Sequence, residues 1–187
     1  MLLKFITLPL LELKFKKSLD KLSPILQHLP KKKRIHSVNV GRLLHKIGAS
    51  DIGIYAGTLH DYLEKGGTIE SISDHLEELK LSPQILHLIQ SLSSDEKNTG
   101  LENEPLIHIT KIIPNLPTDA KNLIILIKLS DRLDNLRKRL MIKGRVGNKY
   151  KCKSRDLVDY LTLQYDGDVK PMKKLLRKLW NPRLLGW

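Results

Sequence analysis

The sequence KLSDRLDNLR at residues 128–137 places charged side chains inside an apolar helical pattern. Asp131 follows Ile124 and Ile127 at helical spacing, so the three side chains share one face of a helix. Asn135 continues that face one turn later. An ionised carboxylate is costly to bury unless it is paired or binds a cation. The segment therefore predicts a long helix with an inward-facing polar group.

A second segment, AGTLHDYLE at residues 56–64, places a His-Asp dipeptide on another helix. His60 lies on the same face as three small residues that allow a second helix to approach closely, Gly53, Ala56 and Gly57. We expect His60 to face the contact with that helix.

A third segment contributes His36, which shares a helical face with Val40 and Leu43. A single histidine on an apolar face is usually a hydrogen-bonded core residue. Two imidazoles and two carboxylates on apolar faces, from His36, the His60-Asp61 dipeptide and Asp131, need a reason to be buried, and a bound metal ion is the simplest one.

Three motifs in this order resemble the HD-domain hydrolases of the RelA/SpoT type, and most closely the small alarmone hydrolases. They are RIHSVNVGRLL at residues 34–44, HDYLEKGGT at 60–68, and KLSDRLDNLR at 128–137. The resemblance covers residues 31–160. It implies an HD-domain helical bundle with His36, His60, Asp61 and Asp131 as metal ligands.

The chain as a whole is predicted to be all-α, because helical spacing and capping signals recur and no strand-like alternation is present. We expect an N-terminal helical segment at 1–30, an HD hydrolase domain at 31–165, and a basic C-terminal helix and tail at 166–187 packed on the same domain. Basic loops are expected at Lys31–Arg34 and Gly144–Lys153, and Asp51 is expected to cap the helix that carries His60.

Imidazole and carboxylate ligands suit Mn²⁺, Fe²⁺ or Zn²⁺, and the resemblance favours Mn²⁺. It also implies an enzyme that removes the 3′-pyrophosphate from guanosine tetra- or pentaphosphate. Four residues are expected by resemblance to bind this phosphorylated guanine nucleotide: Arg34, Lys97, Asn135 and Arg155.

One position departs from the family pattern. The family has Glu-Asp after the His-Asp dipeptide, where this chain has Glu64 and Lys65. The resemblance implies that Glu64 positions the attacking water, whereas Lys65 cannot accept a proton as an aspartate does. Either Lys65 contacts substrate phosphate in a retuned hydrolase, or the protein is a catalytically weak, metal-containing protein that binds nucleotide or RNA.

Charge is distributed unevenly along the chain, whose formal net charge is +13. Residues 48–110 carry eleven acidic and three basic side chains, whereas residues 137–187 carry four acidic and fifteen basic ones. An acidic centre suits a metal site, and basic flanks suit a polyanion. An alternative function is therefore an RNA-directed phosphohydrolase that acts on a tRNA end, like antitoxin members of the family.

Cysteine content and hydropathy limit the remaining possibilities. Cys152 is the only cysteine, so an intramolecular disulfide is excluded and a reducing cytoplasm is expected. No stretch reaches the roughly 20 apolar residues needed to span a bilayer, so no membrane partner is expected. The oligomeric state is left open.

Overall fold

The computed structural model describes residues 3–93 and 104–185, and within these ranges it contains helices and no strands, which confirms the all-α prediction. The HD-domain arrangement itself stays a prediction. Two short 3₁₀ helices are present, η1 (Leu63–Lys65) and η2 (Ile113–Asn115). The α-helices are α1 (Leu3–Gln27), α2 (Lys31–Ile47), α3 (Asp51–Leu59), α4 (Ile69–Glu78), α5 (Gln84–Leu92), α6 (Glu104–Ile112), α7 (Thr118–Lys143), α8 (Asn148–Gln164) and α9 (Val169–Leu179).

The contact between α2 and α3 is very close because glycines lie in it. A Cβ atom on Gly57 would lie 2.1 Å from Leu44 Cδ1, and one on Gly41 would lie 2.1 Å from Thr58 Oγ1. Gly57 was predicted to allow such an approach, and the structure confirms it. This packing fixes how far His36 on α2 lies from the end of α3.

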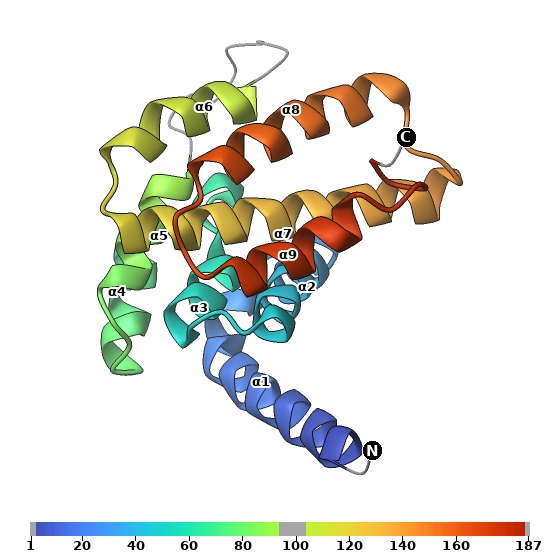
Figure 1. Ribbon diagram of the computed structural model, residues 1–187. Coiled ribbons are helices and arrows are strands. Elements are labelled where there is room, and N and C mark those ends of the chain that lie inside the picture. The colour runs from blue at the N-terminus through green and yellow to red at the C-terminus, as the bar shows by residue number, and fades with distance from the viewer. Residues whose placement is uncertain (1–2, 94–103, 186–187) are drawn as a thin grey trace.

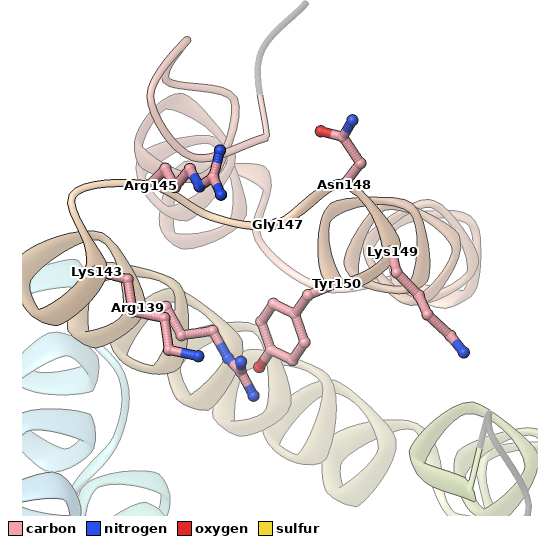
Figure 2. A pocket seen from close by; sticks show the side chains of 7 residues that line it. All are labelled: Arg139, Lys143, Arg145, Gly147, Asn148, Lys149 and Tyr150. Carbon is pink, nitrogen blue, oxygen red and sulfur yellow. The ribbon is translucent and has the colours of Figure 1, made fainter.

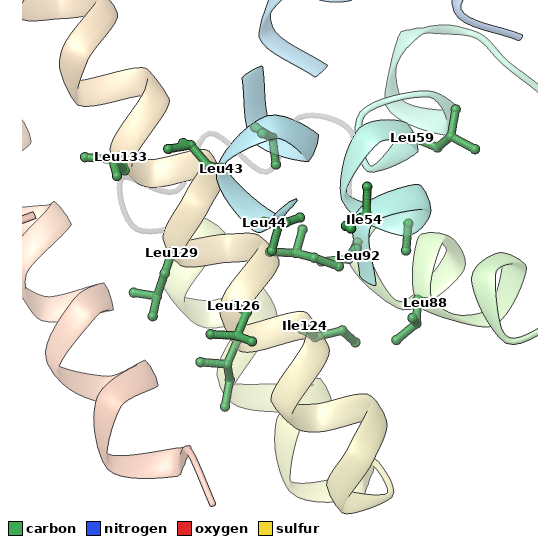
Figure 3. Close-up of a cluster of buried hydrophobic side chains, with 14 of the residues drawn as sticks. Leu43, Leu44, Ile54, Leu59, Leu88, Leu92, Ile124, Leu126, Leu129 and Leu133 are labelled. Carbon is green, nitrogen blue, oxygen red and sulfur yellow. The ribbon is translucent and has the colours of Figure 1, made fainter. Parts of the chain in front are cut away.

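The long helix α7 crosses the middle of the molecule, with α8 and α9 on different sides of it (Figure 1). Its buried leucines and isoleucines pack against side chains from α2, α3 and α5 (Figure 3). Burying one such side chain contributes about 1.5–3 kcal/mol. Fully buried members of this core include Leu44, Leu59, Leu92, Ile124 and Leu129.

The C-terminal helix α9 packs on α7 and α2. Its apolar face is formed by Met172, Leu175 and Leu179, all buried. On its other side, Lys174 Nζ donates a hydrogen bond to the carbonyl of Ile47 at the end of α2, at 3.3 Å. The remaining lysines and arginines of α9 therefore surround one apolar stripe.

Three local predictions were wrong. Lys31–Arg34 is the first turn of α2 and not a loop, because Pro30 supplies a preset φ of −54° and its carbonyl accepts from the backbone N–H groups of Lys33 and Arg34. Ser50, and not Asp51, caps α3, since its hydroxyl accepts from Gly53 N–H.

The predicted basic loop at Gly144–Lys153 is also largely helical. Gly144 ends α7 in the left-handed conformation, with φ +66°, and α8 begins only four residues later at Asn148. Both ends of this short turn carry basic side chains. No helix within residues 3–93 or 104–185 is long and apolar enough to cross a membrane.

Candidate metal centre

Three helices bring together His36, His60 and Asp131, which lie far apart in the sequence. His36 lies in α2, His60 is the C-terminal cap of α3, and Asp131 lies in the middle of α7. One potential ligand atom from each lies within 4.8 Å of the other two. Both imidazoles are buried, and Asp131 is partly buried. This group could hold a metal ion.

The two imidazoles direct their Nε2 atoms toward the same carboxylate oxygen. His36 Nε2 lies 3.0 Å from Asp131 Oδ1, and His60 Nε2 lies 3.8 Å from it. The rings meet edge to face, with centroids 5.3 Å apart. Two nitrogens and one oxygen therefore converge on one small volume.

The opposite nitrogen of each ring is held by a hydrogen bond. His60 Nδ1 donates to the backbone carbonyl of Gly57 at 2.8 Å, and His36 Nδ1 donates to Asp134 Oδ2 at 2.7 Å. Because a carbonyl can only accept, the proton of neutral His60 must be on Nδ1, which leaves Nε2 as a free lone pair. Hydrogen bonds of this kind orient histidine ligands in metal sites.

Asp134 was not among the predicted site residues. It follows Asp131 by three positions in α7, and this spacing places both carboxylates on neighbouring parts of one helix face. Its side chain is 12% exposed, and it binds His36 from the side opposite Asp131. The three-residue spacing from Asp131 could have indicated that Asp134 lies near the site. That Asp134 contacts His36 follows only from the packing of α2 on α7.

His60 Nε2 is buried without a suitably aligned hydrogen-bond partner among the described residues. Asp61 Oδ1 lies 3.1 Å away, yet the geometry is that of an ion pair and not of a hydrogen bond. Buried polar atoms in native structures nearly always have a partner. A cation coordinated by this lone pair would satisfy it, so the residues present fit a metal.

Asp61, the fourth predicted ligand, lies at the edge of the centre. Its carboxylate contacts His60, but it is not a member of the compact group of three. It directly follows His60, the C-terminal cap of α3.

In the metal-free protein both imidazoles bind protons strongly. Burial lowers the pKa of His36, but contacts with Asp131 and Asp134 outweigh this effect and raise the pKa from 6.5 to about 9. Burial also lowers the pKa of His60, while Asp131 and Asp61 outweigh it and raise the pKa to about 10. A metal ion would displace these protons and take over their charge.

The carboxylates are affected in the opposite direction. Burial raises the pKa of Asp61, but His60 overcomes this and lowers the pKa from 3.8 to about 2. Burial likewise raises the pKa of Asp131, and the neighbouring imidazoles of His36 and His60 overcome this and bring the pKa well below 3.8. Both carboxylates are therefore ionised over the neutral range and available to a cation.

The residues predicted to bind nucleotide have varied surroundings. Asn135 Nδ2 donates a hydrogen bond to Asp131 Oδ1 at 2.6 Å, so its amide orients the carboxylate of that candidate metal ligand. Arg34 donates to the carbonyls of Gln27 and Leu29, and thus joins the end of α1 to α2.

Arg155 donates through Nε and Nη2 to the carbonyl of Leu185, at 2.9 and 2.6 Å, and so holds the C-terminal segment on α8. Lys97 lies outside the described residues. The sequence alone did not reveal that the two arginines bind backbone carbonyls, because those carbonyls lie beyond the motifs that suggested them.

Glu64 and Lys65 lie in η1, just after the turn that carries His60 and Asp61. Their charged groups are 3.8 Å apart, and their side chains are 32% and 29% exposed. Both are therefore reachable from solvent. The helix predicted to carry the His60-Asp61 dipeptide ends just before it, at Leu59, with His60 as its C-terminal cap.

Comparison of the chain with protein-family models, with curated proteins and with solved structures finds no match.

Proposed function

We propose that this protein is a metal-dependent phosphohydrolase that removes the 3′-pyrophosphate from guanosine tetra- or pentaphosphate or a related nucleotide. The observation that carries the proposal is the buried group of His36, His60 and Asp131, in which His60 Nε2 has no aligned hydrogen-bond partner among the described residues. The reaction is inferred from the resemblance of the three sequence motifs to HD-domain hydrolases.

Within this proposal, His36, His60 and Asp131 hold the cation, and Asp61 completes the set from the edge. Mn²⁺ is favoured by the resemblance, and Fe²⁺ and Zn²⁺ also suit imidazole and carboxylate ligands. A bound cation of this kind lowers the pKa of a coordinated water and stabilises negative charge on phosphoryl oxygens.

The chain's own groups supply the remaining steps. The family resemblance assigns Glu64, which is solvent-accessible and lies in η1 just after His60 and Asp61, to accepting a hydrogen bond from the attacking water and orienting it. The Lys65 ammonium beside it contacts a substrate phosphate. Asp134 and the Gly57 carbonyl keep the two imidazoles in the orientation that directs Nε2 toward the cation.

The test combines metal analysis with product identification. Purified protein is loaded separately with Mn²⁺, Fe²⁺ and Zn²⁺ and incubated with guanosine tetraphosphate, other phosphorylated nucleotides and tRNA. We expect pyrophosphate and GDP from guanosine tetraphosphate with Mn²⁺, and no product from His60→Ala.

His75→Ala is the matched control, because His75 Nδ1 also bonds to a carbonyl of its own helix but lies outside the metal-ligand group. Metal binding without turnover of any substrate would contradict the enzyme and favour the metal-containing binding protein. Release of phosphate or pyrophosphate from tRNA alone would favour the RNA-directed alternative.

A further inference from the structure

A pocket of about 380 Å³ lies where α7 turns into α8 (Figure 2). It is distinct from the metal centre: none of its lining residues belongs to the group around Asp131. Four of the lining residues are basic, and none of them is acidic: Arg139, Lys143, Arg145 and Lys149. We call this feature the α7–α8 pocket.

The cations of the α7–α8 pocket come from both sides of a tight turn. Arg139 and Lys143 lie in the last turns of α7, where the negative end of the helix dipole favours positive charge. Lys149 lies in the first turn of α8, where the dipole disfavours positive charge. The helix dipoles therefore stabilise the positive charges of Arg139 and Lys143 and destabilise that of Lys149.

Arg139 is held in place by Tyr150. Its guanidinium carbon lies 3.8 Å from the centre of the Tyr150 ring (Figure 2), and the guanidinium of Arg132 lies 5.2 Å from the same centre. A guanidinium stacks through its face, so the N–H groups at its edge can form bidentate hydrogen bonds with an anion. Arg132 is only 9% exposed, and its Nε has no hydrogen-bond partner among the described residues.

We propose that the α7–α8 pocket is a binding site for the phosphate groups of a polyanionic ligand, either an RNA strand or a free polyphosphate. Arg139, Lys143 and Arg145 carry like charges that repel one another, and no acidic residue lines the pocket, so a bound anion stabilises the cluster. A phosphate group supplies negative charge, and its oxygens accept bidentate hydrogen bonds from arginine. The site is independent of whether the metal centre hydrolyses its substrate.

The distance to the metal centre constrains how one ligand could use both sites. Arg139 follows Asp131 by eight positions in one continuous helix, which corresponds to about 12 Å along the helix axis. The two sites face different directions, because eight residues rotate the side chain by about 80°. An extended strand can reach both, whereas a small anion occupies one at a time.

The experiment measures binding and does not depend on turnover. Inorganic triphosphate and a single-stranded oligouridylate are titrated into wild-type protein and into the double variant Lys143→Gln/Arg145→Gln. The control is Lys16→Gln/Lys17→Gln, which removes the same charge from exposed positions on α1. Neither pair takes part in the stack on Tyr150.

We expect the pocket variant to bind at least about tenfold more weakly, because hydrogen bonds between charged groups are among the strong ones. The control should bind as wild type does. For the oligouridylate, the slope of log K against log salt concentration should become shallower by about 1.4, because each lost phosphate contact removes about 0.7.

The two probes separate the sources of phosphate. Equal affinity for triphosphate and oligouridylate identifies a free polyphosphate as the ligand, and binding of the oligouridylate alone identifies an RNA strand. Arg139→Lys, which keeps the charge but loses the two-pronged geometry, should weaken binding in either case. The proposal is overturned if the pocket variant binds both probes as tightly as the Lys16/Lys17 control.

Discussion

The two ends of the same stretch of α7 have opposite physical character. Around Asp131 and Asp134, the helix is covered by α2 and α3, and its carboxylates face two buried imidazoles. Two turns later, Arg139 and Lys143 are exposed and line the α7–α8 pocket. Because buried charges must be matched almost one to one, the first region tolerates little change. Exposed charges are screened by salt and water, so substitutions in the second region are expected to have smaller effects on stability.

The largest effect is expected from removing the carboxylate that both imidazoles share. Asp131→Ala should abolish stoichiometric metal binding, measured by elemental analysis of protein loaded with Mn²⁺. It should also reduce the free energy of unfolding of the metal-free protein by about 3 kcal/mol, because it leaves buried protonated histidines without their partner. Asp119→Ala, at an exposed position of the same helix, is the control. Unchanged metal content in Asp131→Ala would rule out the centre.

A large effect on rate is expected at Lys65. Lys65→Asp restores a Glu-Asp pair beside the centre and should increase hydrolysis of guanosine tetraphosphate by about 100-fold, the usual contribution of a positioned proton acceptor. Pyrophosphate release by wild type, Lys65→Asp and Glu64→Ala is compared under the same metal loading. Wild-type turnover that Glu64→Ala leaves intact would contradict the role proposed for Glu64.

An intermediate effect is expected at Asp134, which supports His36 without belonging to the metal-ligand group. Asp134→Asn keeps the shape of the side chain but removes its charge, and it should weaken Mn²⁺ binding by about 10-fold, at the lower end of the range for residues that orient histidine ligands. Metal titration of this variant beside Asp119→Asn provides the measurement. An affinity equal to that of wild type would mean that His36 needs no support from Asp134.

The smallest effect is expected from pH. The pKa values of His36 and His60 are raised in the folded, metal-free protein to about 9 and about 10. Their stabilising contribution is therefore complete below pH 6.5 and is lost as pH rises through these values.

We expect the free energy of unfolding to fall by about 1–2 kcal/mol over this range. Urea unfolding of metal-free wild type and of His60→Gln at several pH values isolates the contribution. A loss of equal size in both proteins would assign it to groups other than His60.

The all-α fold class and the inward direction of the polar groups could be predicted from the amino-acid sequence. Spacing of apolar residues predicts an all-α chain, because a helix repeats its faces every 3.6 residues whatever packs against it. The same spacing indicated that His36, His60 and Asp131 face inward. The small residues before His60 indicated a close helix contact, which Gly57 provides against Leu44.

Which of these residues contact one another could not be predicted from the sequence. The hydrogen bond between His36 and Asp134 joins residues 98 positions apart, and no local pattern specifies such a pair. The same holds for Arg155, whose guanidinium binds the Leu185 carbonyl, and for the cations on either side of Gly144 that form the α7–α8 pocket. Periodicity fixes the face on which a side chain lies, but the distance between faces depends on how the helices pack, and that packing is set by the whole core at once.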